Sequence, residues 1–336
     1  MSRSIKFLLM LVGLGVFAGA AFLWRNSPSQ VPTREFEFHF STHIPALPEG
    51  SGALRVWIPV PESDNQQEIS QLALESRVPY QLHRDPEYSN LYAYLEVDPR
   101  TETGPLEVTL RFRVKRREHR VTPNAPAEHA SATAIKPAER ARFLQPDRLV
   151  PIDGVIAALA EQETSGLTHP LDKARAIYNY VVSTMRYDKS GEGWGRGDAI
   201  YACNSRKGNC TDFHALFIGM MRAAGIPARF EIGFPLPRHR GAGDIPGYHC
   251  WAQFYLDQVG WVPVDASEAW KDPGRRDFFF GAHDENRVLF TRGRDIRFNP
   301  PQQGEPVNYL IYPYAELGGK PFAGLQNRFS FRDLSP

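Results

Sequence analysis

The segment from Gly208 to Pro227 constrains the fold most, because it carries the signals of an amphipathic helix with a cysteine at its start. Asn209 is a good helix cap, and Asp212 completes an approximate capping box with the favourable charge. Apolar residues then recur at helical spacing until the sequence Gly225-Ile226-Pro227 ends the run; they are Phe213, Leu216, Phe217, Met220, Met221 and Ala224. The pattern predicts a helix that buries one face and begins at Cys210.

This position makes Cys210 a candidate nucleophile. The first turn of a helix presents backbone N–H groups without intrahelical partners and about half a positive charge, so it stabilises a thiolate and lowers the pKa of a cysteine. The ordinary alternative is that a cysteine on an amphipathic helix is a small buried apolar residue. A catalytic thiol also needs a base and a group that orients the base.

Candidates for both lie in two strand-like segments, His249–Leu256 and Gly260–Asp265, which are predicted to form a hairpin. His249 and Asp265 share a face if an odd-length loop or a bulge joins the strands. A three-residue loop that ends at Gly260 would stagger them by roughly a dozen ångström, so we expect a longer loop or a bulge if they meet. The alternatives are a hydrogen-bonded packing histidine and a turn-forming aspartate.

These segments carry a resemblance to a known family. Residues from about 170 to 270 resemble the core domain of the transglutaminase-like superfamily, within the papain-like thiol enzymes; the matching blocks are Gly208–Phe213 with Arg222–Arg229, His249-x-Trp251 and Gly260–Asp265. The resemblance implies a triad of Cys210, His249 and Asp265 that works by acyl transfer through a thioester. It also implies an α+β core in which the cysteine helix packs against an antiparallel sheet. It does not fix the reaction, because the superfamily includes cross-linking transglutaminases, peptidases, amidases and members without catalysis.

The intermediate of acyl transfer needs hydrogen-bond donors for its oxyanion, and the backbone N–H of Cys210 is the first candidate. Trp194, in a Gly-rich stretch, is a second candidate through its indole N–H, or else it anchors its own loop by packing. Asn209 and Trp251 are weaker candidates. His214 lies one turn after Cys210, where it is either an alternative base or a packing residue.

The N-terminus predicts export from the cytoplasm. Residues 1–6 are basic, and Phe7–Trp24 is an unbroken apolar run ahead of a Pro/Ser-rich stretch. Ala18-Gly19-Ala20 is an acceptable cleavage site, but about eighteen apolar residues are also long enough to span a bilayer. Residues 1–24 are therefore a signal peptide or a membrane anchor, and the membrane is a partner only if they are uncleaved. Both alternatives place the remainder in the periplasm.

Three cysteines in an oxidising compartment leave one thiol unpaired. If Cys210 is free, Cys203 and Cys250 are the remaining pair for a disulfide, and the alternative is two buried thiols. The residues that could bind zinc are Cys203, Cys210, His214, His249 and Cys250. A structural zinc site usually has two close pairs of such residues. Here the one close pair is His249 and Cys250, whose side chains would point to opposite faces of a strand. We expect no metal and, without a phosphate-binding loop or nucleotide fingerprint, no cofactor.

The chain of 336 residues has room for about two domains, and its formal net charge of +1 gives no reason to expect a nucleic-acid partner. Period-two alternation predicts an all-β, immunoglobulin-like sandwich over residues 33–121; its segments are Phe36–Phe40, Leu54–Ile58, Leu91–Leu95 and Leu106–Phe112. Residues 122–137 are the predicted linker. Residues 138–336 are the predicted transglutaminase-like core with a C-terminal strand extension, and helices are expected at Ile152–Glu163 and Pro170–Met185.

Together these features predict an exported thiol enzyme. It would transfer or hydrolyse an acyl group at a glutamine carboxamide, a peptide or an isopeptide bond, and its substrate would be an envelope protein or a peptidoglycan-associated peptide. Hydrolysis is preferred because water is abundant and no segment builds an amine-acceptor tunnel. The alternative from another class is a non-catalytic peptide-binding or scaffold module of the envelope that retains the cleft.

Overall fold

The structure is a computed structural model that describes residues 31–123 and 134–334. The predicted signal peptide or anchor, residues 1–24, lies outside the described residues, as does most of the predicted linker. Within the described ranges, no helix is long and apolar enough to cross a membrane. The helices are α2 (Pro137–Arg142), α3 (Gly154–Glu163), α4 (Pro170–Thr184), α5 (Ala199–Ser205), α6 (Cys210–Ala223), α7 (Ala266–Lys271) and the 3₁₀ turn η2 (Pro273–Arg275).

Over residues 31–123 and 134–334, the strands form two five-stranded sheets, one four-stranded sheet and two short pairs. The first sheet has the order β11-β18-β1-β6-β3, and its strands are β1 (Thr33–Ile44), β3 (Gln67–Ser76), β6 (Leu106–Arg117), β11 (Ala242–Asp244) and β18 (Gln326–Asp333). The second has the order β17-β16-β2-β5-β4, with β2 (Leu54–Pro59), β4 (Tyr80–Arg84), β5 (Leu91–Val97), β16 (Tyr314–Leu317) and β17 (Lys320–Pro321). The third has the order β13-β12-β10-β15, with β10 (Ala228–Pro235), β12 (His249–Leu256), β13 (Gly260–Val264) and β15 (Arg287–Arg292). The short pairs are β7 (His119–Arg120) with β14 (Ala282–His283), and β8 (Arg186–Tyr187) with β9 (Lys207–Gly208).

Alternation along β1 and β6 buries one face of the first five-stranded sheet. Phe36, Phe38 and Phe40 of β1 are buried while the residues between them are not, and β6 repeats the pattern. All four segments predicted from period-two alternation lie within strands. Strands β3 and β4 were not predicted, because both lie at sheet edges and expose most of their residues, so neither has a clear apolar period.

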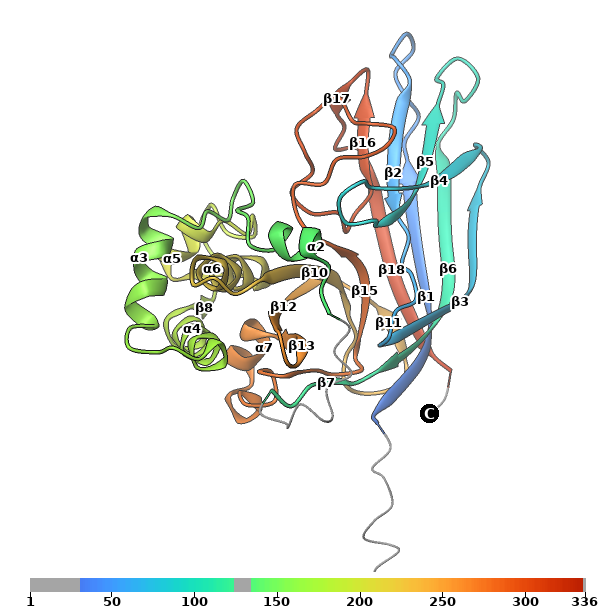
Figure 1. Cartoon of the computed structure of the whole chain (residues 1–336). Helices are drawn as coiled ribbons and strands as arrows, with labels where there is room; N and C mark the ends of the chain where they lie inside the picture. Colours follow the sequence, from blue (N-terminus) through green and yellow to red (C-terminus); the bar gives the residue numbers. More distant parts are fainter. Residues whose placement is uncertain (1–30, 124–133, 335–336) are drawn as a thin grey trace, which may run out of the picture. The chain divides into compact units, whose positions relative to one another are not determined.

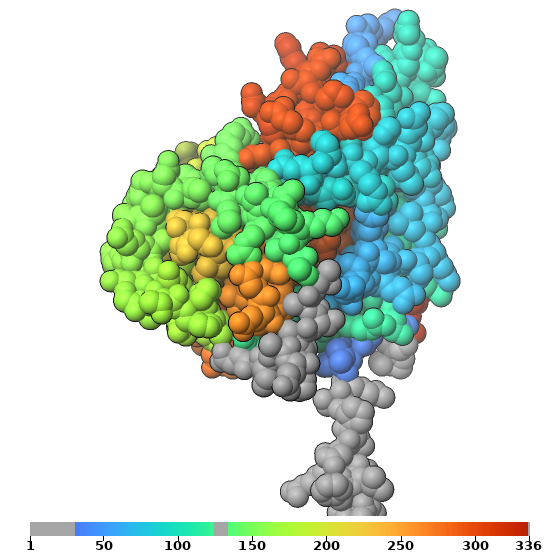
Figure 2. All heavy atoms as spheres, in the orientation of Figure 1, coloured from blue at the N-terminus to red at the C-terminus, as the bar shows by residue number. Residues whose placement is uncertain are grey.

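Strands from the C-terminus complete both N-terminal sheets. β18 pairs with β1, and β16 pairs with β2, both antiparallel. Figure 2 shows the C-terminal residues against the N-terminal ones on this side of the molecule. The strand extension that the sequence analysis left with the core segment therefore pairs with the first strands instead. The immunoglobulin-like form of the predicted sandwich stays a prediction.

The core has the predicted arrangement of a cysteine helix on an antiparallel sheet. Helix α6 packs against β12 and β10, with Phe217 against Phe254, and α3, α4 and α5 surround its other sides (Figure 1). The helix ends where Gly225 adopts a φ of +78°, as the Gly-Ile-Pro signal predicted. Phe38 of β1 contacts Phe234 of β10 and Phe290 of β15, so the N-terminal sheet supports the sheet that carries the site.

Candidate active site

The start of α6 fixes the position of Cys210. The Asn209 side chain accepts a hydrogen bond from the backbone N–H of Thr211 at 2.9 Å, and Asp212 accepts one from the N–H of Asn209 at 2.9 Å, so the predicted capping box is present. Gly208 precedes it with a φ of +152°, and a Cβ there would lie 2.3 Å from Asp212 Oδ2. Only glycine fits this approach. Cys210 is the first residue of the helix, so its backbone N–H has no intrahelical acceptor.

Asp212 also holds the Gly-rich loop beside the start of α6. Its carboxylate accepts hydrogen bonds from the backbone N–H groups of Gly195 at 2.7 Å and Gly197 at 3.0 Å. Asp212 is fully buried, and three backbone donors satisfy it. One carboxylate thus caps the helix and ties a neighbouring loop to it.

His249 and Asp265 meet, with 2.8 Å between His249 Nε2 and Asp265 Oδ2. The expectation of a longer loop or a bulge is wrong. Leu256 pairs with Gly260 in regular register, so a three-residue loop begins at Asp257, one residue earlier than assumed. This register leaves a stagger of two residues, about 7 Å, which diagonal side chains span across a sheet.

Buried partners hold Asp265 in place. Its Oδ2 also accepts a hydrogen bond from Arg287 Nη1 at 3.0 Å, and its Oδ1 accepts bonds from Ser267 Oγ at 3.1 Å and the Glu268 N–H at 3.0 Å. Asp265 caps α7 through the last of these bonds. Burial raises the pKa of Asp265, but His249 and then Arg287 outweigh it and hold the pKa well below its usual value. Asp265 is therefore a carboxylate at neutral pH.

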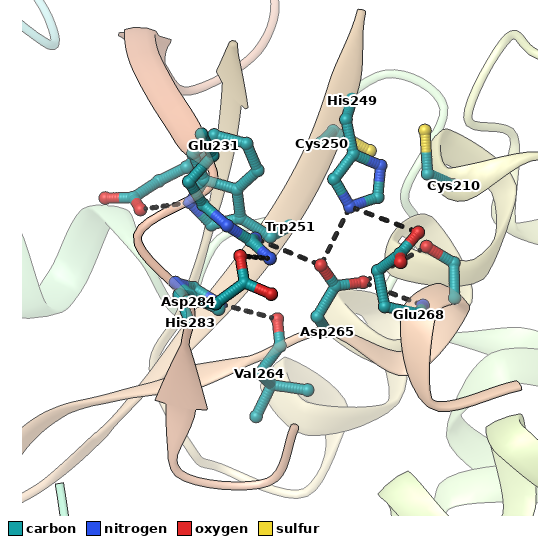
Figure 3. Close-up of polar contacts among 12 residues, drawn as sticks. Cys210, Glu231, His249, Cys250, Trp251, Val264, Asp265, Glu268, His283 and Asp284 are labelled. Carbon is teal, nitrogen blue, oxygen red and sulfur yellow. Dashed lines mark hydrogen bonds and ion pairs between the residues drawn. The ribbon is translucent and has the colours of Figure 1, made fainter. Parts of the chain in front are cut away.

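The electrostatics favour a thiolate and an imidazolium. Figure 3 shows the Cys210 sulfur at the start of its helix, facing the ring nitrogen of His249 that does not bond Asp265. Burial raises the pKa of Cys210, but hydrogen bonds from Cys250 and His249 and the charge of His249 hold it well below the usual value. Burial lowers the pKa of His249, whereas Asp265 and Cys210 raise it to about 10. Each charge therefore stabilises the other.

His214 is neutral and serves as a link in the core. Its Nε2 accepts a hydrogen bond from the Ala266 N–H at 3.1 Å, so the proton lies on Nδ1, which donates to the Cys210 carbonyl at 2.8 Å. Burial lowers the pKa of His214 and keeps the ring uncharged. Both nitrogens are engaged, which fits the packing role and leaves no lone pair for a base.

The other predicted site residues bond elsewhere. Trp194 Nε1 donates to the carbonyl of Gly191 at 3.1 Å, so the loop-anchor interpretation describes its contact. Asn209 acts as the cap, and its Nδ2 donates to the Tyr248 hydroxyl at 3.1 Å. Trp251 is fully buried and donates to Glu231 at 2.8 Å, below the guanidinium of Arg287. Each of these three side chains thus donates its hydrogen bond to a residue other than Cys210.

Cys203, Cys210 and Cys250 are all free thiols, and of the two thiols that the alternative describes as buried, only Cys250 is buried. Cys203 lies half-buried on α5. Cys250 is buried on the face of β12 that α6 covers, with its Sγ 3.6 Å from His214 Nδ1. Its neighbour His249 points to Asp265 on the other face, as strand alternation predicts.

Sequence reasoning missed Arg287. It comes from β15, and Asp284 accepts a bond from its other terminal nitrogen at 3.4 Å, so its guanidinium bridges two buried carboxylates. The position was recognised only as part of a C-terminal strand, since an arginine in such a strand usually lies on a solvated face. The one available signal in the sequence was an arginine directly before an apolar, strand-like run, Val288–Phe290.

Comparisons with known proteins agree with this geometry. Residues 157–266 match the transglutaminase-like superfamily, and this segment contains the cysteine helix and the hairpin. The core of the chain is therefore similar to that superfamily over residues 157–266. An uncharacterized protein of Haemophilus influenzae is 26% identical over 350 residues, covering 93% of this chain and 94% of that protein. The uncharacterized protein YebA of Bacillus subtilis is 24% identical over 134 residues, covering 36% of this chain and 18% of its own length.

A solved structure shares the fold of both the N-terminal sheets and the core. It is a Cytophaga hutchinsonii protein proposed to be a cysteine protease, with a TM-score of 0.62, 17% identity, and coverage of 90% of this chain and 92% of its own. At this identity the likeness establishes the arrangement of helices and strands. The chemistry must be argued from the residues of the site.

Proposed function

We propose that this chain is an exported thiol enzyme that cleaves an amide bond, in a polypeptide or a glutamine side chain, through an acyl-Cys210 thioester. The observation that carries the proposal is the buried contact of His249 with Asp265 beside a Cys210 whose pKa is held low. A thiol that served only packing would gain nothing from a charged partner.

The residues divide the reaction into two balanced steps. The Cys210 thiolate attacks the carbonyl carbon, and the backbone N–H of Cys210 is the proposed donor to the oxyanion. The carbon–nitrogen bond then breaks, and the His249 imidazolium gives its proton to the leaving amine. Neutral His249 next takes a proton from water, whose oxygen displaces the sulfur and releases the acid. Asp265 keeps the second ring nitrogen protonated throughout.

Hydrolysis is the proposed main outcome, and a lysine amine in place of water would give a cross-link. The substrate pool is envelope protein or peptidoglycan-associated peptide. Export rests on the basic and apolar sequence of residues 1–24. N-terminal sequencing of protein recovered from periplasmic and membrane fractions would test it, and recovery from the cytoplasm would contradict it.

A matched pair of cysteine variants tests the proposal. Wild type, Cys210→Ser and Cys203→Ser are incubated with reduced, carboxymethylated casein, and new amino termini, released ammonia and incorporation of a fluorescent primary amine are measured. Cys210→Ser should reduce turnover by at least ~10³-fold, because the nucleophile is lost. Cys203→Ser makes the same chemical change at a half-buried thiol on α5 and should keep turnover. Equal turnover by the two variants would contradict Cys210 as the nucleophile, and no turnover by the wild type would support the non-catalytic binding module instead.

A further inference from the structure

An open cleft lies along β18, and its lining residue Tyr312 packs against Tyr248, which bonds the cap of the cysteine helix. A cavity of about 520 Å³ is lined by Asp244, Ile245, Pro246, Tyr312 and the start of β18 at Asn327–Phe329. A second cavity of about 300 Å³ shares Asp244, Arg328 and Phe329 with the first, so the two adjoin. Their combined size suits an extended ligand, whereas a small-molecule site is usually more enclosed. We call these residues the β18 groove.

The edge of β18 is unpaired at this groove. β11 is the edge strand of the first sheet, and it ends at Asp244, opposite Ser330. The Ile245 N–H still donates to the Phe329 carbonyl at 2.8 Å. Before Phe329, no strand of the described chain lies on that side of β18. Because hydrogen-bonding directions alternate along a strand, the N–H and C=O of Asn327 point to this open side.

The β18 groove leads to Cys210. Its wall Ile245-Pro246 continues directly through Gly247 and Tyr248 to His249. The Tyr312 ring packs edge-on against Tyr248 with 5.9 Å between their centroids, and the Tyr248 hydroxyl accepts a bond from Asn209, the cap of the cysteine helix. A contiguous wall thus joins the groove to the nucleophile.

Two further observations agree with this connection. Burial raises the pKa of Tyr312, a hydrogen bond with the Tyr248 backbone lowers it, and the charge of Cys210 adds a smaller rise. A Cβ built on Gly247 would contact Tyr312 alone, at 3.7 Å, so the space above this residue is open. Glycine at such a point lets another backbone approach closely.

We propose that the β18 groove binds the polypeptide substrate as an added β-strand, with main-chain hydrogen bonds to Asn327, and directs its scissile carbonyl towards Cys210. The inference rests on the proposed function for the identity of its occupant. Strand addition gives affinity through the backbone and tolerates varied sequences, while alternate side chains give specificity. Asp244 and Arg328 are exposed at the groove, so both are available to charged side chains of the substrate.

The substrate class that follows is an unfolded or extended segment. A folded protein whose strands are already paired offers no free backbone to the edge of β18. The groove therefore favours flexible stretches of envelope proteins or peptides over compact domains.

A pair of variants at one position tests the main-chain bond. Asn327→Pro removes the N–H on the open side, where proline leaves the pairing with β1 intact. Asn327→Ala loses the same side chain, including its bond from Thr42 Oγ1, but keeps the N–H. In a Cys210→Ala background, binding of fluorescein-labelled carboxymethylated casein is measured by fluorescence polarisation. The Kd should be at least tenfold higher for the proline variant than for the alanine variant; equal values, or no binding by either, would overturn the proposal.

Photo-cross-linking gives a second test that does not depend on folding of the proline variant. A benzoylphenylalanine at Arg328 should cross-link casein, whereas one at Glu75, on the opposite edge strand β3, should not. Cross-linking of equal yield from both positions would refute the groove. Both tests use protein without the nucleophile, so their result is independent of whether Cys210 turns over substrate.

Discussion

Asp265→Asn tests the electrostatic basis of the site most directly. The change keeps the shape of the side chain but removes the charge that lies 2.8 Å from His249. Burial lowers the pKa of His249, and the charges of Asp265 and Cys210 raise it to about 10. Without the carboxylate, the pKa of His249 should fall towards or below its ordinary value, because burial then meets less opposition. Cys210 would lose its cationic partner at neutral pH.

The magnitude follows from the two protonation windows. In the wild type the pKa of Cys210 is held well below its usual value and the pKa of His249 is raised to about 10, so the thiolate fraction should change little between pH 6 and pH 9. In Asp265→Asn, Cys210 should titrate like an ordinary thiol of pKa about 8.5 or higher, which leaves about 0.3% thiolate at pH 6 and about 76% at pH 9. The ratio of the reaction rate at pH 9 to that at pH 6 should change from near one to about 240.

The assay is alkylation of Cys210 by iodoacetamide between pH 5 and 10, followed by mass spectrometry of the labelled peptide. Asp147→Asn is the matched control, because Asp147 is also a buried carboxylate, paired with Arg222 and Arg142 at 2.7 Å each, with no contact to His249. Its pH profile should stay flat. A flat profile for Asp265→Asn would refute the ion-pair reasoning, and a steep profile for Asp147→Asn would trace the effect to general destabilisation.

Two further predictions concern the support of the site. Gly208→Ala should lower the free energy of unfolding by about 2 kcal/mol, because its Cβ would displace the capping carboxylate of Asp212, whereas Gly225→Ala, at a positive φ with nothing within 4 Å, should lower it by about 1 kcal/mol. Urea denaturation would measure both, and equal losses would contradict the capping argument. His214→Gln should flatten the fall in melting temperature between pH 6.5 and 5, since burial lowers the pKa of His214 and the unfolded chain therefore binds the extra proton. If the melting temperature of the variant falls with pH as steeply as that of the wild type, His214 is not buried as a neutral ring.

The cysteine helix could be predicted from sequence because its signals are local. The cap, the capping box and the glycine stop all lie within one segment, and the structure places each of them as expected. Whether His249 reaches Asp265 depends on the register of the hairpin. Moving the start of the loop by one residue changes that register, and the sequence did not fix where the loop starts. The assignment of the three residues as a catalytic triad remains a prediction for the variants above to test.

Contacts between distant segments could not be predicted in this way. Arg287 reaches Asp265 from a different strand, and no spacing in the sequence relates the two. The same holds for β16 and β18, whose alternation indicates strands but not their partners. Pairing between segments hundreds of residues apart is set by the packing of whole sheets, which local patterns do not record.

The first sheet is complete only when β18, the last strand in the sequence, has been synthesised. β1 and β18 lie side by side, and Arg34 bonds Asp333 at 2.8 Å, although almost the whole chain separates them. A nascent chain that stops before Gln326 leaves one side of β1 bare and lacks the strand on which β11 docks. Such distant pairing forms slowly. Helix α6 precedes β18 in the chain, so a partly made chain carries Cys210 before the first sheet is complete.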